Sequence, residues 1–223
     1  MFEDGVSIGK EVRPPLQLSR SVPDSFSCFC ATVVFRIQNK LLEVAYVPYR
    51  RNGIGSSVRK LAGGMGKKSE SPLQIIAREI HEELGLEIEE KDFQFCFSTS
   101  PLSDPKHIKL FFVVTREIKE QLRDTPYDAE TGAPQWAGPE WLAKNLFGVH
   151  KEVFPKAVDI LLQHFMEHEN IECLLAAVKS GLLEPDDKVK ELLLQKALGD
   201  SKFAFTHAEE LEDLGIGGGG YCF

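Results

Sequence analysis

The chain has 223 residues, of which 43% are hydrophobic and 27% are charged, and its formal net charge is -8. This composition is typical of a globular protein long enough to bury a core. It argues against bulk nucleic-acid binding, which needs many Lys and Arg to displace counterions. Five cysteines without CxxC spacing indicate neither a disulfide framework nor a zinc knuckle.

The location of the protein is expected to be the cytoplasm. The first residues include acids and no apolar stretch of signal-peptide length, and no apolar run approaches the roughly 18 residues of a membrane helix. Reduced thiols are the default in that compartment. We therefore expect no membrane contact.

The N-terminal half is predicted to start with an irregular arm and a β-hairpin. Residues 1–25 are rich in Pro, Ser and charge, as in an irregular segment. The segments 28–37 and 41–49 have the β-branched and aromatic content of strands, and the turn predicted at 38–40 between them favours a hairpin. A Gly- and Ser-rich loop, 52–57, follows.

A helix is predicted between residues 70 and 84. Leu73, Ile76, Ala77, Ile80 and Leu84 form one apolar stripe at helical spacing, and Gly85 follows where a C-terminal cap belongs.

The remaining elements are two strands and then helices alone. Strands are predicted at 92–100 and 107–117, and a short helix near 139–147, where Pro139 suits the first turn. From about residue 150 the apolar spacing is helical throughout. We predict a domain at 26–150, a helical C-terminal extension at 151–214 and a Gly-rich tail at 215–223.

Three carboxylates gather on one face of the predicted helix. Glu79, Glu82 and Glu83 stand at i, i+3 and i+4. These like charges repel one another, and hard Mg²⁺ or Mn²⁺ prefers carboxylate oxygens. The alternative is a merely solvated acidic face. The glycine-rich loop before the helix, with Gly63 and Gly64, favours a metal or anion site, because its backbone can approach such a ligand closely.

The loop and the helix together resemble the Nudix box, GX5EX7REUXEEXGU with U aliphatic. Every specified position is satisfied, by Gly64, Glu70, Arg78, Glu79, Ile80, Glu82, Glu83, Gly85 and Leu86. The resemblance extends over about residues 26–150. It implies an α+β fold, a mixed β-sheet sandwiched between helices, to which this chain adds its helical extension.

The resemblance also implies roles for these residues. Glu79, Glu82 and Glu83 would be catalytic and bind Mg²⁺ or Mn²⁺, with the carbonyl of Gly63 as a further ligand. Gly64, Glu70, Arg78 and Gly85 would be structural, Arg78 pairing with a carboxylate such as Glu70. The general base is a box glutamate in some members and a distal glutamate in others. Here Glu130 is the distal candidate, and Gln135 stands where many relatives have a Glu.

The substrate is expected to be a nucleoside diphosphate derivative. Pro101, 15 residues beyond Leu86, is similar to the downstream proline of ADP-ribose and nucleoside-diphosphate-sugar pyrophosphatases. Phosphate contacts are expected from Gly64 and from some of the basic residues around the loop, which are Arg50, Arg51, Arg59, Lys60, Lys67 and Lys68. Candidate platforms for a base are Tyr46, Tyr49, Phe97, Tyr127 and Trp136.

Two alternatives to this function stay open. One is a pyrophosphohydrolase acting on nucleoside triphosphates or dinucleotide polyphosphates. The other is a non-catalytic regulator that binds a nucleotide, with the helical extension responding to occupancy. The helical extension could also mediate the association of two chains into a homodimer.

Overall fold

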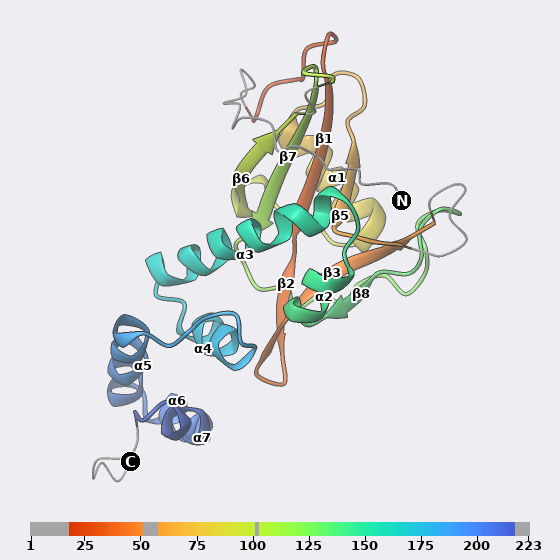
Figure 1. Cartoon of the computed structure of the whole chain (residues 1–223). Coiled ribbons are helices and arrows are strands. Elements are labelled where there is room, and N and C mark those ends of the chain that lie inside the picture. Colours follow the sequence, from red (N-terminus) through yellow and green to blue (C-terminus); the bar gives the residue numbers. More distant parts are fainter. Residues whose placement is uncertain (1–17, 51–57, 101–102, 217–223) are drawn as a thin grey trace, which may run out of the picture.

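The computed structural model describes residues 18–50, 58–100 and 103–216 (Figure 1). The predicted arm is therefore described only from residue 18 and the tail only to residue 216, and the predicted loop 52–57 lies outside the described residues. A mixed four-stranded sheet forms the centre. Its strands, in spatial order, are β5 (Ala62–Met65), β1 (Ser27–Val33), β7 (His107–Val114) and β6 (Phe93–Thr99). β1 runs parallel to β7 and antiparallel to β5.

A second sheet lies below the central sheet and above the C-terminal helices in Figure 1. Its strands are β2 (Phe35–Gln38), β3 (Leu41–Tyr49), β4 (Val58–Lys60) and β8 (Gln135–Ala137). The single strand predicted at 28–37 is wrong, because the chain leaves the first sheet at Val34 and enters the second. Val33, Val34 and Phe35 are all buried, like the end of β1 before them, so burial alone does not mark the boundary between the two strands.

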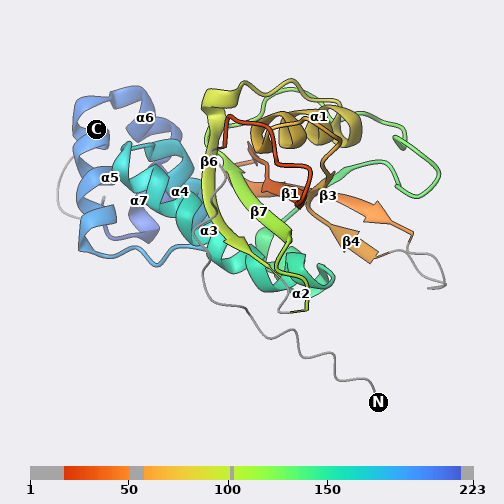
Figure 2. The same ribbon diagram turned by 90° about the horizontal axis from the view of Figure 1, so that it is seen from above.

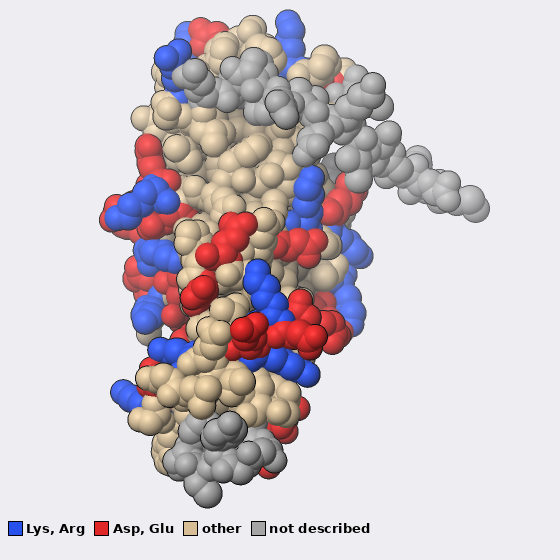
Figure 3. All heavy atoms as spheres, turned by 90° about the vertical axis from the view of Figure 1, so that its left-hand side faces the viewer, with Lys and Arg blue, Asp and Glu red and all other residues tan. Residues whose placement is uncertain are grey.

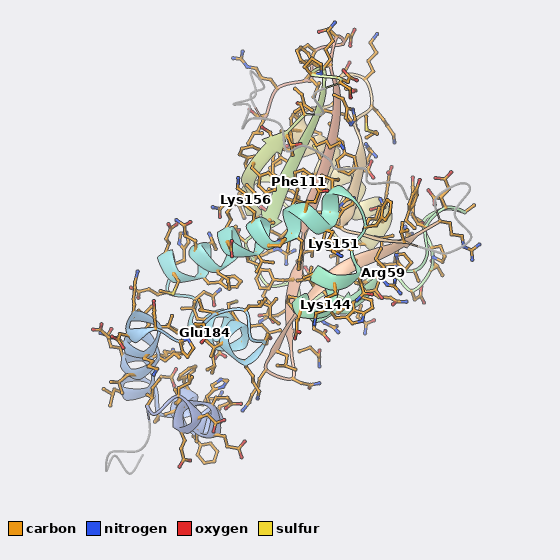
Figure 4. All side chains as sticks on the ribbon, viewed as in Figure 1. Arg59, Phe111, Lys144, Lys151, Lys156 and Glu184 are labelled. Atoms are coloured by element: carbon orange, nitrogen blue, oxygen red, sulfur yellow. The ribbon has the colours of Figure 1, made fainter. Side chains whose placement is uncertain are left out.

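Two helices cover opposite faces of the central sheet (Figure 2). α1 (Pro72–Leu84) packs on one face and α3 (Val149–Glu167) on the other. Successive residues of β7 alternate between these layers: Phe112 packs with the α1 side, whereas Phe111 packs toward α3 (Figure 4). The predicted sheet between helices is confirmed.

Local sequence signals set the ends of α1. Ser71 and Gln74 form a capping box, and Pro72 occupies the first helical position. The helix thus begins at residue 72 and not at 70 as predicted. Gly85 ends it with φ 75°, a left-handed conformation that favours glycine. The predicted cap is confirmed.

The other elements differ from the predictions mainly in their bounds. The strand predicted at 107–117 ends at Val114, and β4, β5 and β8 were not predicted. They have three or four residues each, too short for a periodic signal. The short helix η1 (Glu90–Asp92) precedes β6, and α2 (Pro139–Asn145) follows β8.

Beyond α3, the described residues form four more helices, which lie beside the second sheet (Figure 1). They are α4 (Ile171–Lys179), α5 (Asp187–Gly199), α6 (Ser201–Thr206) and α7 (Ala208–Asp213). The hydroxyl of Ser180 accepts a hydrogen bond from the backbone N–H of Leu42 at 2.8 Å. Lys40 lies 2.9 Å from Glu210 on α7. These contacts fix the helical extension to the β2–β3 hairpin.

The surface carries both signs of charge. Acidic and basic side chains are intermixed over the face shown in Figure 3. Among the described residues, no helix is both long and apolar enough to cross a bilayer.

Candidate active site

The acidic face of α1 packs against strand β5. Glu79 and Glu83 are buried in spite of their charge, and the backbone N–H of Gly63 donates to Glu83 Oε2 at 2.9 Å. A Cβ added to Gly64 would lie 2.5 Å from both carboxylate oxygens of Glu79. Glycine at position 64 therefore leaves the space that the carboxylate of Glu79 uses.

Gly63 is required for a different reason. Its φ of 149° is one that side chains rarely adopt, and a Cβ there would lie 2.2 Å from the carbonyl oxygen of Cys30 in β1. The backbones of β5 and β1 approach closely here. The glycine loop thus holds one edge of the sheet next to the acids of α1.

Arg78 ties the acids of the box together. Its Nε donates to Glu70 at 2.7 Å, and its Nη1 donates to Glu79 and to Glu82, both at 2.8 Å. Nη2 also bonds the carbonyl of Met65 at 3.0 Å. The predicted pair of Arg78 and Glu70 is present, and the same guanidinium reaches two of the three box acids.

Two lysines contact further carboxylate oxygens of the box acids. Lys60 Nζ lies 2.5 Å from Glu83 Oε1 and 2.7 Å from the carbonyl oxygen of Gly63. Lys67 Nζ lies 3.3 Å from Glu82 Oε1. Four carboxylates therefore face three basic side chains.

The environment shifts the pKa values of these acids in opposite directions. Burial raises the pKa of Glu83, and it also raises the pKa of Glu79, because a charged carboxylate loses hydration there. Burial acts on Glu82 as well, but Arg78 and Lys67 outweigh it and lower the pKa of that carboxyl. A bound cation would therefore stabilise the charged forms of Glu79 and Glu83 most, since burial disfavours those forms.

The donor chemistry fits a hard divalent cation, whereas the present side-chain arrangement leaves it little room. Gly63 and the three box glutamates offer only oxygen donors, which Mg²⁺ and Mn²⁺ prefer. Within the described ranges, no three His, Cys, Asp or Glu side chains stand ready to hold a metal. Lys60 lies against oxygens of both Gly63 and Glu83. Metal binding at these oxygens would require Lys60 to move aside.

A loop between β7 and β8 passes over the same acids. Nη1 of Arg123 donates to the carbonyl oxygen of Glu82. Loss of hydration, together with the negative charge of Glu82, raises the pKa of the Tyr127 hydroxyl. The guanidinium of Arg123 lies 5.7 Å from the Tyr127 ring. Tyr127, a candidate base platform in the sequence, thus lies beside a box glutamate.

Tyr49 connects Glu130, the predicted distal base, to the site. Glu130 Oε2 accepts a hydrogen bond from the Tyr49 hydroxyl at 3.3 Å. The Tyr49 ring in turn lies 5.6 Å from Lys60 Nζ. Glu130 itself is exposed.

The predicted phosphate-binding arginines are distributed differently. The guanidinium of Arg59 lies 5.0 Å from the Trp141 ring of α2 (Figure 4). The backbone N–H of Arg50 donates to the carbonyl of Glu130 at 2.7 Å, and its side chain is exposed. Arg51 and Pro101 lie outside the described residues.

A cavity of about 690 Å³ adjoins the glycine loop. Gly63, Gly64 and Lys60 form the side next to the box. Other parts of its lining are distant in sequence: Phe29 from β1, His107 and Lys109 from β7, and Phe147 and His150 around the start of α3.

The sequence analysis did not predict the distant part of this lining, which is Phe29, His107, Lys109, Phe147 and His150. No local motif marks them, since only the packing of α3 on the sheet brings them together. The alternation of β7 places His107 and Lys109 on one face, and that is the only signal available in the sequence.

Comparison with known proteins identifies the class. The model of the NUDIX domain matches residues 31–157, more than half of the chain. The chain therefore belongs to the NUDIX domain family, and it is a Nudix pyrophosphohydrolase, of the class that hydrolyses diphosphate linkages in nucleotide derivatives. No curated protein sequence matches it.

Solved structures share the fold at low identity. A MutT/nudix family protein from Enterococcus faecalis has a TM-score of 0.57 at 17% identity, covering 78% of this chain and 82% of its own. The NUDIX domain of Shewanella oneidensis NrtR, complexed with ADP ribose, has a TM-score of 0.50 at 15% identity, covering 60% and 87%. NrtR complexed with a 27mer DNA has a TM-score of 0.51 at 14% identity, covering 77% and 83%.

Proposed function

We propose that this protein is a divalent-metal-dependent hydrolase that cuts the diphosphate bond of a nucleoside diphosphate derivative, with ADP-ribose or a nucleotide sugar as its substrate. Glu79, Glu82, Glu83 and the carbonyl of Gly63 would hold Mg²⁺ or Mn²⁺. Such an ion would neutralise charge on the phosphates and polarise a water molecule.

The observation that carries this proposal is the continuity of the acidic cluster with the cavity. Lys60 and Gly63 line the cavity, and both contact Glu83. The described lining contains Lys60, His107, Lys109 and His150 but no carboxylate. A ligand in the cavity would therefore meet cationic and neutral groups and extend its phosphates toward the box acids.

The chain's own residues have distinct tasks in this mechanism. Lys60 and Lys109 would attract the phosphates, since each presents a point charge to the cavity. Arg78 would hold Glu79 and Glu82 in position through the bonds described above. The catalytic geometry thus depends on a guanidinium that does not itself touch the substrate.

Glu130 is proposed as the general base. Its carboxylate contacts Tyr49, which lines the same cavity, and its exposure allows a water molecule to reach it. The carboxylate would accept a proton from water as the water oxygen bonds to phosphorus. The bond between that phosphorus and the bridging oxygen then breaks, and the bridging oxygen leaves with the second phosphate.

Two observations support this substrate class: the volume of the cavity, and the ligand found in a solved structure with the same fold. A cavity of this size is in the range of small-molecule sites. The NUDIX domain of S. oneidensis NrtR was solved with ADP ribose, so this fold accommodates that kind of ligand.

A substrate panel tests the proposal. The protein is incubated with Mg²⁺ or Mn²⁺ and with ADP-ribose, nucleotide sugars, dinucleotide polyphosphates or nucleoside triphosphates, and the products are identified by mass spectrometry. AMP released from ADP-ribose supports the leading substrate, whereas pyrophosphate released from triphosphates overturns it. Tight nucleotide binding without turnover of any compound would instead favour the non-catalytic regulator.

A further inference from the structure

His150 is a buried polar residue with an unsatisfied atom. It lies in the first turn of α3 and lines the cavity. Its side chain is buried, and Nδ1 has no hydrogen-bond partner among the residues that the structure describes. Leaving a buried polar group without a partner destabilises a folded protein. An apolar side chain at position 150 would not leave such a group unpartnered, so packing alone does not explain the histidine.

The imidazole is neutral under ordinary conditions. Burial lowers the pKa of His150 to about 3, and the positive charges of Lys60 and Lys109 act in the same direction. A neutral imidazole has one donor and one acceptor nitrogen. It can therefore hydrogen-bond an uncharged heterocycle, and it does not offer a charge to phosphate.

The walls around His150 suit a flat apolar ring. The Phe29 ring lies 5.8 Å from the imidazole at an interplanar angle of 70°. Tyr49, Val58 and Phe147 add further aromatic and aliphatic surface to the same cavity. Aromatic side chains of this kind stack with bases of any type.

The lining of the cavity also includes two ammonium groups, those of Lys60 and Lys109. Lys60 borders the box acids through its contact with Glu83. Lys109 makes no ion pair within the described ranges. The cavity thus combines aromatic walls and one neutral imidazole with ammonium groups, which matches a heterocyclic base attached to phosphates.

We propose that this cavity receives the heterocyclic base of a nucleotide and that His150 is its specificity-determining residue, hydrogen-bonding the edge of the base. This inference rests on the proposed function for the orientation of the ligand, with its phosphates toward the box. It adds a recognition residue outside the box and assigns it a role in binding, not in bond cleavage.

Metal-free binding measurements test the inference apart from turnover. Calorimetry compares AMP and UMP with ribose 5-phosphate, which lacks the base. At least one nucleotide should bind the wild-type protein about tenfold or more tightly than ribose 5-phosphate, because base stacking contributes on the order of 1–3 kcal/mol. Equal affinities for all three ligands, or no binding of any, would overturn the inference.

Two variants assign the effect to His150. Replacing His150→Phe keeps a ring and removes both nitrogens, so the preference for the base should fall by about three- to tenfold, the value of one hydrogen bond. His150→Gln retains a donor and an acceptor and should recover part of it. The matched control is His168→Phe, at an exposed position at the end of α3, which should leave the preference unchanged.

Thermal unfolding separates recognition from a structural role. Because Nδ1 is unpartnered, His150→Phe should melt no lower than the wild-type protein. An unchanged base preference in both His150 variants would refute the assignment. So would a large loss of stability in both, because His150 would then support the fold. Turnover of the substrate panel without any base preference would leave the proposed hydrolysis intact and refute only this inference.

Discussion

Lys60 Nζ lies 2.5 Å from Glu83 Oε1, and the same ammonium is 2.7 Å from the carbonyl oxygen of Gly63. One side chain therefore bridges two of the oxygens that we propose as metal ligands. Two cations cannot share this position, because like charges at such distances repel strongly. Lys60 and a divalent ion should compete for these oxygens.

Replacing Lys60→Met should therefore tighten metal binding. The Mn²⁺ affinity, measured by calorimetry at pH 8 without substrate, should rise about three- to tenfold, which is about 1 kcal/mol. The control is Lys68→Met, since Lys68 is exposed and pairs with exposed Asp24. Unchanged or weaker Mn²⁺ binding in the Lys60 variant would show that the lysine does not compete with the ion.

Gly63→Ala should destabilise the fold. The added Cβ would lie 2.2 Å from the backbone carbonyl oxygen of Cys30 in β1, which cannot move aside cheaply, and φ at position 63 is 149°, which side chains rarely adopt. We expect a loss of about 3 kcal/mol or more in the free energy of unfolding by urea. Gly138→Ala is the control, because a Cβ there meets nothing within 4 Å. Equal stability of the two variants would contradict the close approach of β5 and β1.

Gly64→Ala should damage the site more than the fold. Its Cβ would lie 2.5 Å from the carboxylate oxygens of Glu79, the mobile end of a side chain that can rotate away. Unfolding free energy should fall by about 1 kcal/mol or less, whereas Mn²⁺ affinity should drop by about tenfold or more, because one ligand is displaced. Retained Mn²⁺ affinity would argue that Glu79 is not a ligand.

Glu210 gives a pH-dependent contribution to stability. Burial raises the pKa of Glu210, but hydrogen bonds from Lys179 and Lys40 outweigh it and lower the pKa to about 2, from 4.5. A depressed carboxyl pKa stabilises the folded state above the unfolded value, and this stability is lost as pH falls through the folded value. Its contribution is thus full above about pH 4.5 and declines toward pH 2.

The Glu210→Gln variant should show this dependence. At pH 7 we expect a loss on the order of 2 kcal/mol in unfolding free energy, because two lysines lose their partner. The difference from wild type should shrink at pH 3.5. Glu209→Gln, at an exposed neighbouring position, is the control. A difference between variant and wild type that stays constant from pH 7 to pH 3.5 would contradict the assignment.

The sequence predicted those features that depend on local signals. Helix α1 could be predicted because its apolar stripe and the Gly85 cap lie within one short segment. The box acids followed from their spacing on that helix. The break of the first strand at Val34 could not be predicted, since a run of β-branched residues suits one continuous strand as well as two.

Contacts between distant segments were beyond sequence reasoning. Lys60 was one of six basic candidates for phosphate contact, and nothing local singles out its contact with Glu83, 23 positions away. His150 and Phe29 meet only because α3 packs across β1. Such pairs depend on tertiary packing, which a single sequence does not reveal.

The central claim is that Glu79, Glu82 and Glu83 hold a divalent ion that hydrolysis requires. Its most direct test is the rate of hydrolysis of the best substrate in the panel, measured against Mg²⁺ concentration for the wild-type protein and for Glu82→Gln and Glu83→Gln. We predict no hydrolysis in EDTA, recovery with Mg²⁺, and at least roughly a 100-fold lower rate in each folded variant. Hydrolysis that persists in EDTA, or wild-type rates in both variants, would contradict the claim.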